Sequence, residues 1–205
     1  MLRKLDLLPI FVYGHSSSAI EQMTDLQMTQ RPKWTRVSFG RDYCSNFCVF
    51  GERILLSRPA GYATLEDAKE SLRLNEQVVK EGVLKDADYV IIEDFSNLRG
   101  NEPAARAHFI NHLKNNKRLL GLIFCGTSPF FTASIKLCKR FNIVKIDVQV
   151  VRYCSEALEL AVDVLSASFS YFVIQNLFGT YQLPVIISIF QYPLWHDCCG
   201  YLGRR

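Results

Sequence analysis

The residues best suited to chemistry lie at the ends of two apolar segments. Glu93 and Asp94 follow the apolar run "YVII", and Cys125 follows "LLGLIF". Adjacent strand residues point to opposite faces, so the two carboxyl groups do not form a facing acid–base pair. We predict that one is exposed and that the other accepts backbone N–H groups in a polar turn over residues 94–101. Cys125 is interpreted as a small buried side chain beneath a helix, because no Ser-His-Asp or Cys-His order accompanies it.

His108 and His112 form a second candidate pair. They stand four residues apart on a predicted helix, a spacing that presents two imidazoles to one metal ion. Phe109 occupies the position where a metalloprotease helix carries its glutamate, and no third ligand is suggested. We therefore predict a surface pair, no metal site, no catalytic residue and no cofactor.

Alternating strand and helix patterns hold these residues in place. The stretch "WTRVSFG" (34–40) alternates apolar and polar residues, which predicts a half-exposed strand. Strands at 46–50 and 53–57 are joined tightly at Gly51 and Glu52, which predicts an antiparallel hairpin. Further strands alternate with helices; we place these strands at 89–93, 118–126 and 144–151. This order predicts an α/β fold, a mixed β-sheet flanked by helices with an N-terminal β-hairpin.

Each predicted helix begins at a residue that favours an N-cap. Thr64 opens a capping box with Asp67. The three later caps are predicted at Asn101, Ser128 and Ser155. The helix after Ser128 is predicted to bury one apolar stripe, made of Phe130, Ala133, Leu137 and Phe141.

The carboxyl ends of parallel strands meet at one edge of a sheet, where binding crevices form. The candidate partner-binding residues at this edge are Asp94, Ser96, Asn97, Arg99 and Asn101. A candidate anion- or ligand-binding turn is formed by Gly126, Thr127 and Ser128, because free N–H groups at a helix start favour an anion. The competing interpretation is that these residues are ordinary helix caps, and the absence of a glycine-rich phosphate loop favours it.

Composition excludes several classes of protein. The chain has 205 residues, a net charge of +4 and 49% hydrophobic residues, which is typical of a globular protein. Lys and Arg are spread among acidic residues, so we predict no nucleic-acid binding. The seven cysteines include no C-x-x-C pair, and the N-terminus has no secretory h-region. We therefore expect a cytoplasmic location with reduced thiols.

The composition changes twice along the chain. Residues 1–33 are predicted to be an N-terminal arm, 34–166 an α/β domain and 167–205 an apolar extension. The extension is long enough to cross a bilayer, although it contains Gln, Asn, Gly and Pro. Three interpretations stay open: a membrane segment, an apolar extension that needs a partner, and the truncated end of a longer signalling protein. The change in composition favours the last two, and packing on a second copy would make a homodimer.

Four segments together resemble the STAS-like domains related to bacterial anti-sigma-factor antagonists. They are "CVFGERILLSRPAGYATLEDAKESL", "YVIIEDFSNLRGNEPAARAHF", "LLGLIFCGTSPFFTASIKLCKRF" and "VQVVRYCSEALELA", within residues 34–165. The form that precedes PAS and histidine-kinase modules in bacterial sensor proteins is the most similar. The resemblance implies a mixed sheet flanked by helices that acts as an input or protein-interaction module without turnover.

The chain departs from that family at the switch residue. Antagonists of the family carry a phosphorylated Ser or Thr at the helix start, whereas residues 100–104 read "GNEPA" here. Ser96 lies earlier and is a weak substitute. We therefore expect a non-catalytic signalling module that binds a protein partner, such as a signalling kinase or regulatory domain, without a phosphate switch. The alternative is a small-molecule or anion-binding domain acting at helix N-termini, attached to a membrane through its tail.

Overall fold

The structure is a computed structural model that describes residues 26–140 and 146–178. The chain divides into two compact units, Met1–Ala167 and Ser168–Arg205. The sheet and all candidate residues lie in the first unit, and the described part of the second is the end of helix α5 (Cys154–Phe178). The predicted boundaries at residues 33 and 166 stay predictions. Among the described helices, none is both long enough and apolar enough to cross a membrane.

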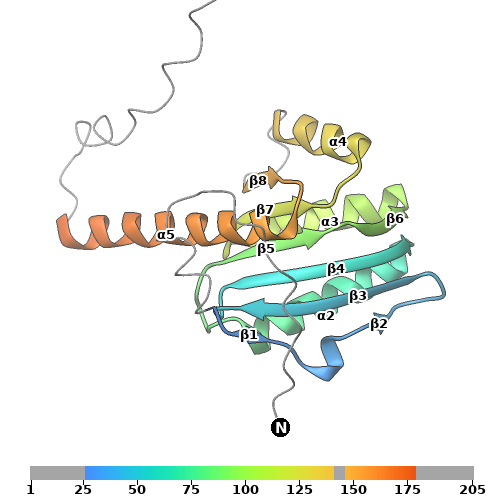
Figure 1. Cartoon of the computed structure of the whole chain (residues 1–205), viewed down its shortest axis with the longest axis horizontal. Coiled ribbons are helices and arrows are strands. Elements are labelled where there is room, and N and C mark those ends of the chain that lie inside the picture. The colour runs from blue at the N-terminus through green and yellow to red at the C-terminus, as the bar shows by residue number, and fades with distance from the viewer. Residues whose placement is uncertain (1–25, 141–145, 179–205) are drawn as a thin grey trace, which may run out of the picture. The chain divides into compact units, whose positions relative to one another are not determined.

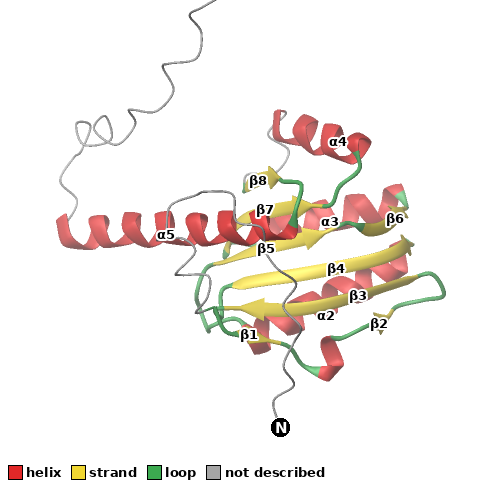
Figure 2. Cartoon of the chain, viewed as in Figure 1, coloured by secondary structure: helices red, strands yellow, loops and turns green. Residues whose placement is uncertain are grey.

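One mixed sheet forms the centre of the first unit (Figures 1 and 2). Six of its strands follow the order β1-β3-β4-β5-β7-β8, while β2 pairs with β3 and β6 pairs with β4. Strands β4, β5, β7 and β8 are parallel, and β1, β2 and β3 make the antiparallel pairs. The strands are β1 (Met28–Thr29), β2 (Val37–Ser38), β3 (Tyr43–Phe50), β4 (Ile54–Ala63), β5 (Tyr89–Asp94), β6 (Asn97–Asn101), β7 (Leu119–Cys125) and β8 (Asp147–Val150). The predicted mixed α/β fold is confirmed.

The predicted hairpin is the β3–β4 pair. Its turn places Gly51 and Glu52 at φ values of +53° and +57°, and the Arg53 N–H donates to the Phe50 carbonyl at 3.1 Å. Two successive residues with a left-handed backbone match the twist of the flanking strands. Glycine adopts this conformation without strain, whereas Glu52 adopts it at some steric cost. Both strands are longer than predicted because their pairing continues to Tyr43 opposite Gly61.

The polar stretch after Asp94 is not one long turn, which corrects the prediction for residues 94–101. Only Phe95 and Ser96 form a turn, and β6 follows at once. Strand β4 is long enough to pair in parallel with β5 over residues 54–57 and with β6 over residues 60–63. The backbone N–H and C=O groups of this stretch are therefore used in the sheet, which a turn would have left to water.

Helices cover both faces of the sheet. Helices α2 (Leu65–Gly82), α3 (Pro103–Asn115) and α4 (Pro129–Arg140) pack on one face, where Val78, Leu113 and Ile135 join the core. On the other face, α5 packs with Ala157 and Ala161, both fully buried. Figure 1 shows α5 in front of the sheet and α2 and α3 behind it.

The predicted buried stripe of α4 is wrong. Phe130 is 77% exposed, Leu137 is 53% exposed and Ala133 is exposed, while Phe141 lies outside the described residues. The helix instead turns Phe131 and Ile135 inward. Both sets have helical spacing, so the apolar pattern on its own does not decide which one meets the sheet.

Trp34 lies in a short 3₁₀ helix, η1 (Pro32–Trp34), and not in the half-exposed strand predicted over 34–40. It is fully buried, and strand β2 covers only Val37 and Ser38 of that stretch. Pro32 at the start of η1 presets the backbone for a turn. This turn places the Trp34 indole in the core, a position that the alternation of apolar and polar residues does not predict.

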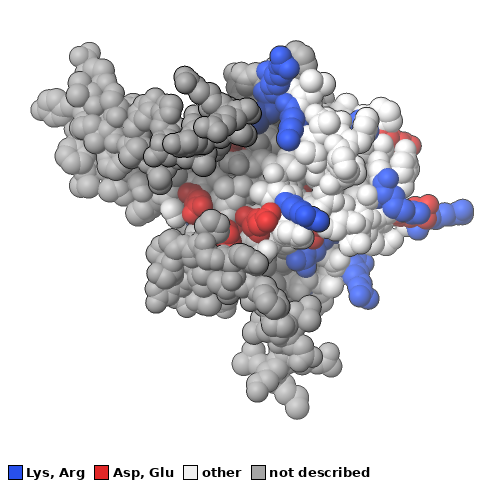
Figure 3. All heavy atoms as spheres, turned by 45° about the horizontal axis from the view of Figure 1, so that its top comes forward, with Lys and Arg blue, Asp and Glu red and all other residues white. Residues whose placement is uncertain are grey.

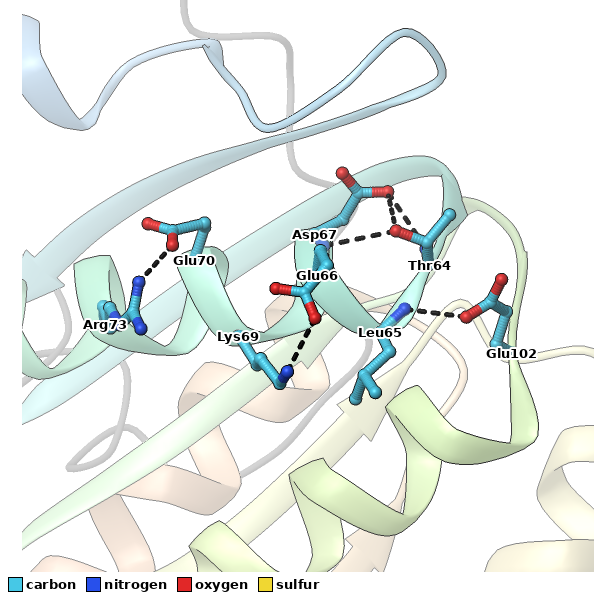
Figure 4. A network of polar contacts seen from close by, with 8 residues as sticks. All are labelled: Thr64, Leu65, Glu66, Asp67, Lys69, Glu70, Arg73 and Glu102. Atoms are coloured by element: carbon cyan, nitrogen blue, oxygen red, sulfur yellow. Dashed lines mark hydrogen bonds and ion pairs between the residues drawn. The ribbon is translucent and has the colours of Figure 1, made fainter.

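The start of α2 is capped by its own first residues and by Glu102, which is distant in sequence (Figure 4). The capping box is confirmed: the Asp67 N–H donates to the Thr64 hydroxyl, and the Asp67 carboxylate accepts the Thr64 N–H at 3.0 Å. The Glu102 carboxylate accepts the Leu65 N–H at 2.8 Å. This contact joins the start of α2 to the segment before α3.

Two predicted N-caps are wrong. Asn101 ends β6, and Glu102 occupies the N-cap position of α3 without a side-chain capping bond. Ser155 lies within the first turn of α5, which begins at Cys154. The Glu156 carboxylate accepts the N–H groups of Arg152 and Tyr153 at 3.0 and 3.3 Å. The Glu156 carboxylate, from within the first turn of α5, thus caps the helix start in place of the predicted Ser155.

Candidate functional site

A cavity of about 140 Å³ lies between the sheet and helices α2, α3 and α4. Most of its walls are apolar; they include Leu72, Phe109, Leu122, Phe124, Phe131 and Ile135. An apolar cavity of about 150 Å³ is known to stay dry and to hold a ligand the size of benzene. The sequence pattern did not predict this cavity, because it depends on how closely three helices approach the sheet.

Three aromatic rings form part of the cavity wall. Phe95 lies 5.1 Å from Phe124 and 5.1 Å from Phe131 between ring centroids, and Phe124 and Phe131 are 6.1 Å apart. The tilted and edge-on contacts are the favoured geometries of aromatic pairs. They link the turn after β5, strand β7 and helix α4.

Glu93 is a buried polar group on the sheet side of the cavity. It is paired in register with Ser57 of β4, so both side chains lie on the same face, and the two are hydrogen-bonded. Only 4% of Glu93 is exposed. Its pKa is raised to about 8, mainly by burial and to a lesser degree by the charge of Asp94, while the Ser57 hydrogen bond acts in the opposite direction. Glu93 is therefore a neutral carboxylic acid at pH 7, able to donate one hydrogen bond and to accept others.

The prediction that one of the two adjacent carboxylates is exposed is wrong. Glu93 is buried, and the Asp94 side chain is 15% exposed. The other half is confirmed: Asp94 accepts hydrogen bonds from the Ser96 N–H at 3.1 Å and the Ser96 hydroxyl at 2.6 Å. A signal for Glu93 exists in the sequence, because period-two alternation places it on the face of Tyr89 and Ile91.

Further polar groups line the same cavity. Asn75 is 4% exposed, and burial raises the pKa of Tyr43 to about 12, so the phenol stays neutral. The Tyr43 and Ser71 hydroxyl oxygens are 3.5 Å apart. The lining also includes the exposed side chains of Arg106 and Lys139. The cavity thus combines neutral polar groups inside with two cations where it reaches the surface.

The predicted partner-binding residues follow the edge and do not converge on one point. Asp94 forms an ion pair with Arg58 at 3.4 Å. Asn97 is exposed, and the 65% exposed Arg99 lies 3.7 Å from the Asp42 carboxylate. Asn101 accepts a hydrogen bond from Arg106 at 3.2 Å. They remain candidates for a surface and do not form a pocket.

The predicted anion-binding residues use their polar groups within the chain. The Gly126 N–H donates to the Arg152 carbonyl at 3.3 Å, and the Thr127 and Thr132 hydroxyls are 2.8 Å apart. Ser128 accepts the Phe131 N–H at 3.3 Å, as predicted for an N-cap of α4. Gly126 has φ +64°, and a Cβ there would lie 2.7 Å from the Ser96 nitrogen. Only glycine fits where these two turns meet.

The candidate histidine pair lies beside α2. His112 approaches the Glu76 carboxylate at 3.4 Å, its side chain is 18% exposed, and burial lowers its pKa. Among the described residues, the one group spaced to hold a metal ion contains no histidine and consists of Asp94, Cys125 and Cys154. Cys125 is 1% exposed, as predicted for a buried thiol.

Charged side chains are scattered over the face drawn in Figure 3. Lys and Arg side chains lie there in several small groups, acidic ones lie near some of them, and uncharged surface separates the groups. Exposed ion pairs of the described residues, such as Lys69–Glu66 at 2.6 Å, contribute little to stability.

No family model matches the chain, and no curated protein matches it. Among solved structures, it is similar to an uncharacterized protein of the DUF3478 family with a SpoIIAA-like fold from Shewanella loihica PV-4. The identity is 17%, the match covers 61% of this chain and 98% of that one, and the TM-score is 0.46. The PAS and histidine-kinase context of the resemblance stays a prediction.

Proposed function

We propose that the chain is a non-catalytic sensory module that binds a small, largely apolar ligand in the cavity beside Glu93. The observation that carries this proposal is a buried carboxylic acid facing an apolar space of about 140 Å³. Pockets for small molecules combine apolar walls with a few placed polar groups. This departs from the alternative predicted from the sequence, in which the ligand sat at helix N-termini.

The cavity defines the chemical class of the ligand. Its volume suits an aromatic ring or a short alkyl group, and the wall of Phe95, Phe124 and Phe131 favours an aromatic ring. Protonated Glu93 favours one uncharged hydroxyl, carbonyl or amide group on that ring. A charged group at this depth would lose its hydration without a counter-charge. Phenol is the simplest probe with both features.

The proposal is tested by measuring phenol and benzene binding by ligand-observed NMR. We expect both to bind, and phenol to bind about tenfold more tightly because of one hydrogen bond. Ala105→Leu should abolish binding, because Ala105 is 2% exposed and lines the cavity. Ala104→Leu is the matched control, since Ala104 is exposed on the same helix. Equal binding by both variants would place the ligand elsewhere and refute the proposal.

A non-catalytic role is supported by the surroundings of the buried thiol. The groups that act on Cys125 are Cys154, Asp94 and Arg58, with no histidine among them. Within the described ranges, no nucleophile, base and acid converge on the cavity. A binding module needs no such set of catalytic groups. A ligand in the cavity would instead change the packing of α4, and this change could be recognised by a partner.

A second candidate is docking of a protein partner along β6, through Asp94, Ser96, Asn97, Arg99 and Asn101. It is favoured by the pairing of β6, which in the described part of the chain bonds to β4 alone and leaves its other edge without a strand. Extended peptides add to such edges. The partner class expected from the resemblance is a signalling kinase or regulatory domain, with a second copy as the alternative.

Capture experiments test this surface. Asn97→Arg and Arg99→Glu should reduce recovery of a specific partner, while Glu70→Gln on the exposed side of α2 should not. Light scattering of the purified chain separates a second copy from another protein. A partner captured equally by all variants would exclude β6 as the docking surface.

A further inference from the structure

Two thiols and a carboxylate meet on the α5 face of the sheet. Asp94 ends β5, Cys125 ends β7, and Cys154 is the first residue of α5. Asp94 and Cys125 are paired in register, so their side chains share a face. One oxygen and two sulfur atoms of these residues all lie within 4.8 Å of one another. Segments up to 60 residues apart in the chain thus bring one carboxylate and two sulfurs together.

The position of Arg58 favours a pair of thiols over a metal site. Its guanidinium donates to the Cys154 sulfur at 3.8 Å and lies 3.4 Å from the Asp94 carboxylate. A divalent cation would need these same atoms and would be repelled by the fixed positive charge between them. The same charge stabilises a thiolate at Cys154. The arrangement therefore favours an ionised sulfur over a bound metal.

The two sulfurs have unequal properties. The Cys125 thiol donates a hydrogen bond to the Cys154 sulfur. This bond and Arg58 lower the pKa of Cys154. The same bond, together with burial and the charge of Cys154, raises the pKa of Cys125. Cys154 also stands at the N-terminus of a long helix, whose dipole favours a negative charge. The charge of Asp94 and partial burial oppose ionisation of Cys154. Neighbouring Cys48 stays a neutral thiol because burial raises its pKa to about 11.

Exposure assigns the order of reaction. Cys154 is partly exposed, whereas Cys125 is 1% exposed. An oxidant from solution reaches the ionised sulfur first, and the buried thiol is placed to react second. This is the arrangement of a redox-sensing cysteine poised beside a resolving one.

We propose that Cys154 and Cys125 form a peroxide-sensitive dithiol that closes to an intramolecular disulfide. The Cys154 thiolate attacks hydrogen peroxide, the O–O bond breaks, and a sulfenic acid forms while the departing hydroxide takes a proton to become water. The Cys125 sulfur then attacks the sulfenic sulfur, the S–O bond breaks, and a second water leaves with the Cys125 proton. Two thiols are oxidised by two electrons, and one peroxide is reduced to two waters.

The disulfide would join the end of β7 to the start of α5. Both lie beside Asp94 and Ser96, which belong to the surface predicted to contact a partner. Oxidation removes the thiolate that Arg58 contacts and leaves this guanidinium to Asp94 alone. The modification therefore changes charge and geometry at the sheet edge without involving the ligand cavity, which lies on the opposite face.

The test is peroxide oxidation of the reduced full chain, followed by alkylation and peptide mapping. We expect a link between the peptides that carry Cys125 and Cys154, and oxidation of Cys154 about tenfold faster than that of Cys44 at pH 7. Cys125→Ser should stop at a sulfenic acid that dimedone traps on Cys154. Cys44→Ser is the matched control and should still form the link.

Several results would overturn the proposal. A link between Cys154 and Cys48, or no link in the folded wild-type chain, removes the assigned pair. Protection of both Cys125 and Cys154 from alkylation by one equivalent of Zn²⁺ would make the cluster a metal site instead. Because the wild-type map does not depend on any substitution, a variant that fails to fold leaves the test intact.

Discussion

Replacing Glu93 with glutamine should remove most of the pH dependence of stability between pH 5 and pH 8. The folded chain keeps the proton of Glu93 up to a pKa of about 8, whereas the unfolded chain releases it near the ordinary value of 4.5. Between these values the folded state binds more protons, so the free energy of unfolding falls as pH rises. The stability contributed by protonated Glu93 is complete below the lower value and is lost as pH rises through the higher one.

The magnitude follows from the two pKa values. Each pH unit between them lowers the free energy of unfolding by about 1.4 kcal/mol, which is about 3 kcal/mol from pH 5 to pH 7. That is a large part of the 5–15 kcal/mol that is typical of a folded domain. Glutamine fills nearly the same volume and carries no charge at any pH. At pH 5 we expect Glu93→Gln to change stability by only about 1 kcal/mol, through its altered hydrogen bond to Ser57.

Urea denaturation of both proteins at pH 5, 6 and 7 measures the effect. All other titrating groups are common to both proteins, so the difference between them reports Glu93. Glu70→Gln, at a side chain that is 53% exposed on α2, controls for loss of one carboxylate. A difference between wild type and Glu93→Gln that stays constant from pH 5 to pH 7 would show that Glu93 is ionised in the folded chain, and the argument for a neutral cavity would fail.

Four other substitutions test the local structure by urea denaturation. Gly126→Ala should cost about 2 kcal/mol, because the residue has a left-handed backbone and its Cβ would meet the Ser96 turn; a neutral effect would contradict that close approach. Thr64→Ala should cost about 1 kcal/mol through loss of the α2 cap, and unchanged stability would mean that the capping box is not formed. Phe131→Ala should cost about 3 kcal/mol and Phe130→Ala less than about 0.5 kcal/mol, since only Phe131 packs on the aromatic cluster; the reverse order would mean that α4 is rotated.

The agreement between sequence and structure is best where the signal is local. The hairpin at Gly51 and Glu52, the capping box at Thr64, and the apolar runs of β5 and β7 depend on neighbouring residues only. Alternation of strands and helices then limits the topology to a sheet with parallel strands. These features needed no knowledge of distant contacts, and they were predicted correctly.

The predictions fail where the local sequence fits two conformations or two orientations equally well. Helix α4 carries apolar residues on two sides, and contact with β8 and the Phe95 turn decides that Phe131 faces inward. Residues 97–101 read as a polar turn, but the length of β4 provides a partner for a further strand. Trp34 continues an alternating pattern, yet the turn at Pro32 carries it into the core.

The sequence by itself determined the β3–β4 hairpin, the strands β5 and β7, the N-caps at Thr64 and Ser128 and the mixed α/β class, because hydrophobic periodicity and capping act over a few residues. Only the tertiary structure decided that Glu93 faces a cavity and that Cys125 meets Cys154. Burial of a carboxyl group and approach of two sulfurs depend on segments that are far apart in the chain and become neighbours when strands align and helices close over them. The chemistry proposed for this protein therefore belongs to contacts that no single segment encodes.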